Sequence, residues 1–291
     1  IGVVMTLFPI FFAVIENDLR KVLCYSLNNQ LGFMVVGVGI GTELALNGAV
    51  AHAFVHILYK ALLFMSMGAV LYRTGTIRAS DLGGLYRSMP WTAAFCIVGA
   101  MSISAFPLFS GFVAKSLTMS AVTEGYYMLT FIGLLIASAG VMEHSGIKIP
   151  YFAFFGHDSG IRCKEAPWHM CLAMGAAAVL CIAIGWFPQP LYALLPYPVV
   201  YQPYADFGHS VTQLQLLLFA ALAFVVLKRT GMYPAEQASL NLDTDWLYRR
   251  VAPRVIRQIV AASRQVGRAF LQTGSELGRT LMRLVLNHYG P

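Results

Sequence analysis

Three ionisable side chains recur at helical spacing in the otherwise apolar stretch 51–60. His52, His56 and Lys60 are four residues apart. On a helix of 3.6 residues per turn, each is therefore turned by about 40° and raised by about 6 Å from the one before. The three share one face, and imidazole titrates near neutral pH. This spacing predicts a relay that passes protons along one side of a helix.

Two simpler roles for these side chains stay open. Two histidines at i and i+4 suit a zinc ion, although no third ligand lies close by in the sequence. His52 and His56 could instead be structural, with the Lys60 ammonium extended toward the membrane surface, which its position near mid-segment makes awkward. We predict no bound metal and no cofactor, because the chain has no phosphate-binding loop, no Cys-x-x-Cys pair and no flavin, haem or iron–sulfur motif.

A second lysine, Lys115, follows Pro107 and Gly111, which predict a break in an apolar helix. Backbone groups freed by a break inside a membrane are tolerated only beside protein or a water-filled cavity. A charge near the bilayer centre costs at least about 2.5–3.5 kcal/mol, so a lysine at such a break indicates an ion path. The alternative is an ordinary anchor at the membrane surface.

The elements that carry these residues are predicted to be membrane-spanning helices. Of the 291 residues, 58% are hydrophobic and 11% are charged, whereas a soluble domain carries about 25% charged residues. A span needs roughly 20 apolar residues, and backbone polar groups in lipid must pair within their own segment. We therefore predict an all-α polytopic bundle of about seven spans, near residues 1–15, 22–41, 48–72, 91–122, 126–142, 169–187 and 211–227.

The basic residues predict how this bundle is oriented. Lys and Arg follow the first and third apolar runs but are absent from the loop 42–47, so the basic loops are assigned to the cytoplasm. If the segment 91–122 is a single broken pass, the loop 145–167, which contains Lys148, is cytoplasmic, and so is the Arg-rich tail. If the segment forms two passes, the Arg-rich tail lies outside, so we predict a single pass.

The tail differs from the rest of the chain. Eight Arg lie between Asp245 and His288, and apolar residues recur there at spacings of four or at multiples near 3.6, which predicts a basic amphipathic helix. We expect it on the cytoplasmic membrane surface or against a partner subunit rather than on nucleic acid. The predicted division is thus a transmembrane bundle over 1–230 and a cytoplasmic linker with the amphipathic helix over 231–291.

These motifs resemble the proton-conducting antiporter-like family, which includes the large membrane subunits of respiratory complex I and of Mrp-type Na+/H+ antiporters. The resemblance covers roughly residues 1–160 and matches the C-terminal half of such a protein. Two further segments, 146–152 and 242–246, are more similar to the D-type subunits of Mrp-type antiporters than to complex I. The family motifs are found at 17–26 with 30–32, at 52–64, at 83–85 and at 107–115.

The resemblance implies roles for the residues singled out above. His52, His56 and Lys60 would belong to a hydrated axis across the mid-membrane, and Lys115 would be its outlet lysine. A partner half with an intramembrane Glu and Lys is also implied, so we expect the chain to begin inside a longer protein. Homologous antiporter-like subunits are the implied partners, and the bacterial inner membrane is the expected location.

The predicted function is proton translocation coupled to Na+ antiport, performed by a subunit of a multi-subunit membrane complex and not by an enzyme in its own right. Two alternatives stay open. One is a proton-pumping membrane subunit of an NADH–quinone oxidoreductase or hydrogenase-type complex, with the redox chemistry in other subunits. The other is a structural membrane subunit that does not transport.

Overall fold

The computed structural model describes residues 1–205, 207–234, 236–237 and 246–290. The chain forms two units, Ile1–Ser239 and Leu240–Pro291. Within the described residues the regular structure is helical, apart from an isolated bridge between Asp18 and Arg78. The predicted all-α fold class is confirmed.

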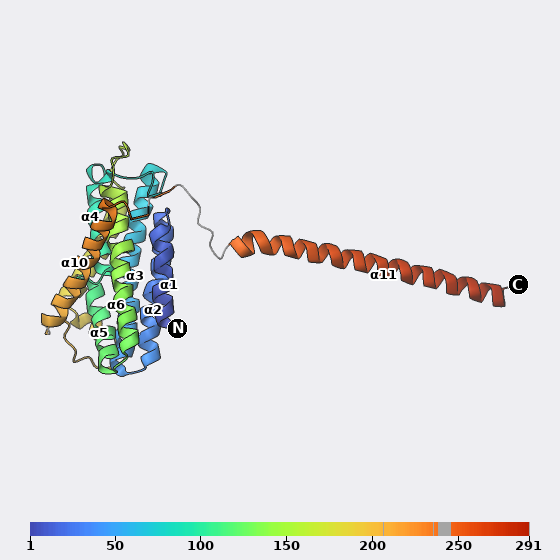
Figure 1. Ribbon diagram of the computed structural model, residues 1–291, viewed down its shortest axis with the longest axis horizontal. Coiled ribbons are helices and arrows are strands. Elements are labelled where there is room, and N and C mark those ends of the chain that lie inside the picture. The colour runs from blue at the N-terminus through green and yellow to red at the C-terminus, as the bar shows by residue number, and fades with distance from the viewer. Residues whose placement is uncertain (206, 235, 238–245, 291) are drawn as a thin grey trace. The chain divides into compact units, whose positions relative to one another are not determined.

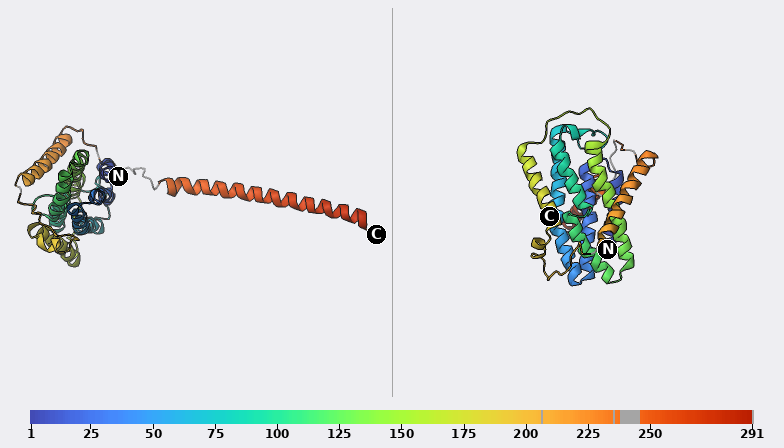
Figure 2. Two further views of the ribbon diagram at one scale, coloured as in Figure 1. Left: turned by 90° about the horizontal axis from the view of Figure 1, so that it is seen from below. Right: turned by 90° about the vertical axis from the view of Figure 1, so that its left-hand side faces the viewer.

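The first unit is a bundle of roughly parallel helices (Figures 1 and 2). Helix α3 is central to it and contacts α2, α4, α5 and α8. A continuous helical segment, Met128–Phe155, combines α-helical and π-helical turns. The helices of this unit are α1 (Gly2–Ile15), α2 (Leu19–Ile40), α3 (Glu43–Thr74), η1 (Leu85–Arg87), α4 (Pro90–Ile103), α5 (Ser110–Glu124), α6 (Met128–Val141), η2 (Met142–Ile147), α7 (Lys148–Pro150), η3 (Tyr151–Phe155), α8 (Trp168–Trp186), α9 (Gln189–Tyr192) and α10 (Phe207–Arg229).

Local sequence explains where the central helices begin and end. The Asp18 carboxylate accepts hydrogen bonds from the backbone N–H groups of Arg20 and Lys21 and so caps the start of α2. Thr42 caps α3 in the same way, through the N–H of Ala45. Both helices end at a glycine in the left-handed conformation, Gly41 after α2 and Gly75 after α3.

Each predicted span has a helical counterpart, and the structure therefore supports a polytopic membrane protein. In the part of the chain that the structure describes, five helical segments are long and apolar enough to cross a membrane: Leu19–Ile40, Glu43–Thr74, Met128–Phe155, Trp168–Trp186 and Phe207–Arg229. Helices α1 and α4 are apolar but shorter. The segment 91–122 is divided into α4 and α5, which Figure 1 shows at different heights of the bundle, as expected for a single broken pass.

The break between α4 and α5 is tightly built. Ala105 and Leu108 have positive φ angles of 58° and 72°, a conformation that costs non-glycine residues of the order of 1–3 kcal/mol each. Gly111, in the first turn of α5, lies so close to the end of α4 that a Cβ there would overlap the carbonyl oxygen of Ser102. The predicted broken helix is confirmed.

The second unit contains the predicted amphipathic helix. Helix α11 (Ala252–Tyr289) follows the π-helical turn η4 (Leu247–Val251). Its apolar side chains, among them Ile259, Phe270 and Leu281, are exposed. Residues 242–245, which belong to the second of the two segments that resemble Mrp-type antiporters, lie outside the described residues.

Candidate proton-relay site

The three residues predicted to form a relay lie on the buried side of α3. His52, His56 and Lys60 are 0%, 8% and 4% exposed. The two imidazole rings are edge-on, with centroids 6.4 Å apart. The Lys60 ammonium donates a hydrogen bond to the backbone carbonyl of Leu23 on α2, over 2.9 Å. It is therefore held inside the bundle and does not extend to the membrane surface.

His52 belongs to a hydrogen-bonded network that the sequence did not reveal. Its Nε2 lies 3.1 Å from the Gln30 Oε1 and 2.9 Å from the Tyr59 hydroxyl, and that hydroxyl donates to the same Gln30 oxygen. The Gln30 amide in turn donates to the Asn29 Oδ1, over 2.7 Å. The Tyr59 hydroxyl proton is already donated to Gln30, so neither nearby oxygen offers a proton to His52. The Nε2 of His52 therefore carries a proton and is the hydrogen-bond donor to these oxygens. Gln30 appeared in the sequence only as part of a family motif, and its contact with α3 could not be inferred.

Two ring nitrogens at this site have no hydrogen-bond partner among the described residues. They are the Nδ1 of His52 and the Nε2 of His56, and both atoms are buried. A buried polar atom without a partner costs about 1–3 kcal/mol. Such atoms are also where a mobile proton or a water molecule can bind.

Lys115 bridges the broken helix. It is 3% exposed, and its ammonium donates to the carbonyl of Ile103, the last residue of α4, over 2.9 Å. Carbonyl groups at the C-terminal end of a helix carry the negative end of its dipole and favour a cation. The ammonium also lies 4.9 Å from the centre of the Phe33 ring, which is 5.8 Å from the His52 ring. Phe33 thus contacts both Lys115 and the histidine site.

A third buried lysine corrects the predicted topology of the loop 145–167. The helix continues to Phe155, the loop begins at Gly156, and Lys148 is fully buried inside the bundle. The prediction that Lys148 lies in a cytoplasmic loop is wrong, because the helix does not end near residue 142, where the apolar run ends, but continues to Phe155. The π-helical turns on either side of Pro150 accommodate the missing N–H donor.

Lys148 is surrounded by oxygen atoms from segments far away in the sequence. Its ammonium donates to the backbone carbonyls of Ala13, Val14 and Glu16, at 3.3, 2.6 and 2.8 Å. It also forms an ion pair of 3.0 Å with Glu236, which follows α10. Burial raises the pKa of Glu236, and the neighbouring Lys148 ammonium opposes that shift.

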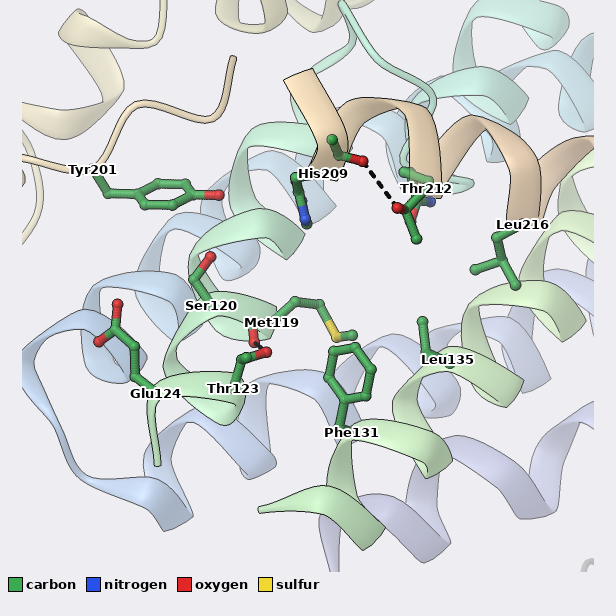
Figure 3. A pocket seen from close by; sticks show the side chains of 12 residues that line it. Met119, Ser120, Thr123, Glu124, Phe131, Leu135, Tyr201, His209, Thr212 and Leu216 are labelled. Atoms are coloured by element: carbon green, nitrogen blue, oxygen red, sulfur yellow. Dashed lines mark hydrogen bonds between the residues drawn. The ribbon is translucent and has the colours of Figure 1, made fainter. Parts of the chain in front are cut away.

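A cavity of about 470 Å³ lies between α5, α6 and α10 (Figure 3). His209, on α10, faces this cavity, and its Nε2 lies 3.0 Å from the hydroxyl of Ser116, the residue after Lys115. Figure 3 shows side chains from α5, α6 and α10 around a common space. The cavity is thus connected, through His209 and Ser116, to the turn of α5 that carries Lys115. The polar side chains that line it are Ser120, Thr123, Glu124, Tyr201, His209, Thr212 and Gln213.

The described residues offer little to a metal ion. No group of three or more His, Cys, Asp or Glu in that part of the chain is arranged to hold one. The pair His52 and His56 accordingly has no third ligand of this kind there. All five cysteines are free thiols.

The sequence is similar to a family model and to several membrane proteins of known type. Residues 1–141 match the family model described as "NADH:quinone oxidoreductase/Mrp antiporter, TM". The D component of the Na+/H+ antiporter of Alkalihalophilus pseudofirmus is 31% identical over 64% of this chain and 38% of that protein. Chain 5 of the NADH–ubiquinone oxidoreductase of Sus scrofa is 30% identical over 54% of this chain and 25% of that protein. Component B of hydrogenase-4 of Escherichia coli is 29% identical over 64% of this chain and 31% of that protein. The chain thus spans less than half the length of these relatives.

Solved structures show the same fold. A chain of the membrane-bound sulfane sulfur reductase, an archaeal respiratory membrane complex, aligns with 98% of this chain and 55% of its own length, with a TM-score of 0.65 and 22% identity. A chain of the Mrp complex of Dietzia sp. aligns with 65% of this chain and 44% of its own length, with a TM-score of 0.60 and 23% identity.

Proposed function

We propose that this chain, whose residues 1–141 match the NADH:quinone oxidoreductase/Mrp antiporter transmembrane family model, carries half of a proton path in a cation antiporter. The observation that carries this proposal is the environment of Lys60 and Lys115. Both are buried, and each donates to a backbone carbonyl. Neither has a carboxylate partner within the described part of the chain. A buried ammonium held only by carbonyl oxygens can lose its proton without breaking an ion pair.

The mechanism is a charge-coupled relay. Two positive charges in a medium of low dielectric repel each other strongly, so a proton that reaches one lysine promotes release from the next. His56 is within electrostatic range of both lysines, Lys60 and Lys115. His52 and His56 lie in the interval and carry the proton across it. The cavity beside His209, which contacts the residue after Lys115, is the proposed access to water at this end of the path.

Antiport of H+ against Na+ is the proposed coupling, and homologous antiporter-like subunits in a hetero-oligomeric complex are the proposed partners. The likeness to the D component of a Na+/H+ antiporter supports this choice. The proposed location is a bacterial inner membrane. The likeness to respiratory chain 5 and to hydrogenase-4 component B supports a second candidate, a proton pump that is driven by redox chemistry elsewhere in its complex. A subunit that keeps the fold but does not transport is the third.

The proposal is tested in the complete protein within its assembled complex, in inverted membrane vesicles. Lys60→Ala and Lys115→Ala should each abolish cation-dependent proton flux while assembly persists. Lys164→Ala, in the exposed loop before α8, is the matched control and should leave flux unchanged. Full flux in both buried-lysine variants would defeat the relay. Flux that follows Na+, K+ or Li+ gradients without a redox substrate would favour the antiporter over the redox-driven complex.

A further inference from the structure

His144 is a buried histidine outside the predicted relay. It lies in the π-helical turn η2 and is 0% exposed. π-helical turns inside α-helices are rare and occur frequently at functional sites. A histidine inside a membrane bundle, placed on such a turn, calls for an explanation.

The hydrogen bonds of His144 determine which ring nitrogen can accept a proton. The Ser145 hydroxyl donates to the Ser26 hydroxyl over 2.8 Å, so its oxygen accepts from the Nδ1–H of His144, also over 2.8 Å. In neutral imidazole the proton on Nδ1 leaves a lone pair on Nε2. That Nε2 is buried and has no hydrogen-bond partner among the described residues.

The turn that carries His144 contacts residues next to the attachment points of both relay lysines. Ser26, which accepts from Ser145, lies about one turn along α2 from Leu23, whose carbonyl holds Lys60. On the other side, Gly146 packs so closely on Ser104 that a Cβ on Gly146 would overlap the Ser104 hydroxyl. Ser104 is the residue after Ile103, whose carbonyl holds Lys115.

The charged groups around His144 agree with this placement. The ammonium groups that act on its ring are those of Lys60 on α3, Lys148 on its own helix and Lys115 on α5. Glu143, its neighbour in the chain, accepts a hydrogen bond of 2.7 Å from the Tyr233 hydroxyl. Both relay lysines are thus among the cations whose charges act on this imidazole.

We propose that His144 is a further proton-carrying residue of the relay and forms a second route between Lys60 and Lys115, parallel to the route through His52 and His56. This rests on the proposed function. In the forward step, the Lys60 ammonium gives up one proton, the Nε2 lone pair of His144 forms the new N–H bond, and a neutral amine and an imidazolium result. The imidazolium then gives that proton to the neutral amine of Lys115, which becomes an ammonium. The Nδ1–H bond to Ser145 holds the ring in place throughout.

The first test replaces the ring. His144→Ala should lower proton flux per assembled complex about tenfold or more, as expected for loss of a positioned acid–base group. Added imidazole should restore part of that flux. Pyrazole has nearly the same shape but is a much weaker base, and it should not restore flux. Restoration by pyrazole equal to that by imidazole would assign His144 a packing role and overturn the proposal.

A second variant decides the result if neither compound enters the site. His144→Asn keeps an amide near the position of Nδ1 for the bond to Ser145 but removes Nε2, and its flux should be as low as that of His144→Ala. Wild-type flux per assembled His144→Asn complex would overturn the proposal. Ser138→Ala, at a buried position on the same helix, is the control for loss of a polar group and should keep normal flux.

Lys60→Ala, measured in parallel, distinguishes a failure of the His144 proposal from a failure of the proposed function. If Lys60→Ala abolishes flux while the His144 variants transport normally, His144 is not in the path and the relay stands. If Lys60→Ala transports normally, the proposed function itself fails.

Discussion

Two kinds of buried lysine occur in this bundle, and their partners differ. Lys60 and Lys115 each donate to one backbone carbonyl, on α2 and at the end of α4. Lys148 donates to three carbonyls at the end of α1 and pairs with the Glu236 carboxylate. A lysine with so many partners keeps its proton and stabilises the fold. An ammonium group held by one neutral oxygen can lose its proton and regain it. Burial alone therefore does not identify a relay lysine, but its set of partners does.

The largest effect on stability is expected at Lys148. Lys148→Met leaves Glu236 and three carbonyls buried without their cation, and breaking a buried pair in this way costs about 3–5 kcal/mol. Thermal unfolding of the purified complex should shift strongly downward, and the amount of assembled protein should fall. Flux per assembled complex should stay near normal. A stable Lys148→Met complex that has lost transport would place Lys148 in the proton path. Lys148 would then not differ in role from Lys60 and Lys115.

A glycine pair tests whether the break positions Lys115. Gly111→Ala introduces a Cβ that overlaps the Ser102 carbonyl, and such overpacking costs about 1–3 kcal/mol. The start of α5 must shift, so the Lys115 ammonium moves away from Ile103 and flux should fall. Gly68→Ala, in α3, has open space around the new Cβ and should leave flux intact. Equal flux in the two variants would show that the geometry of the break is unimportant.

Tyr59→Phe should have a smaller effect. It removes the hydroxyl that connects His52 and Gln30, a loss of about 1 kcal/mol, and leaves both relay lysines in place. Flux should decrease several-fold without being abolished, measured as the initial rate in vesicles. Tyr72→Phe, at an exposed position on the same helix, is the matched control. Complete loss of transport in Tyr59→Phe would mean that the hydroxyl itself carries the proton.

The smallest effect is expected at the exposed ion pair of Arg162 and Asp158, which contrasts with the buried pair of Lys148. The Arg162 side chain holds the pKa of Asp158 well below its ordinary value. A carboxyl whose pKa is lowered by folding adds stability above its unfolded pKa, near 4, and that contribution is lost as the pH falls through the folded value. Because both side chains are exposed and solvent screens their charges, this contribution is small. Asp158→Asn should leave the melting temperature at pH 7 nearly unchanged. A large loss at neutral pH would refute this assignment.

The sequence predicted those features that depend on short-range spacing. The shared face of His52, His56 and Lys60 follows from helical periodicity, and the break before Lys115 follows from Pro107 and Gly111. The seven helical runs follow from apolar length alone.

The features that the sequence did not reveal depend on contacts between distant segments. Lys148 was assigned to a loop because the predicted apolar run ends at residue 142, and the carbonyls that bind it lie more than a hundred residues earlier in the chain. The contacts of Gln30 with His52 and of His209 with Ser116 likewise join separate helices. Periodicity within one helix says which residues share a face, but it does not say which face of another helix they meet.

The most direct test of the account compares Lys60→Met with Lys148→Met in the same vesicles, with proton flux divided by the amount of assembled complex. The account predicts that Lys60→Met assembles well and transports nothing, whereas Lys148→Met assembles poorly and transports normally per complex. The opposite pattern, with transport retained in Lys60→Met and lost in Lys148→Met, would contradict it.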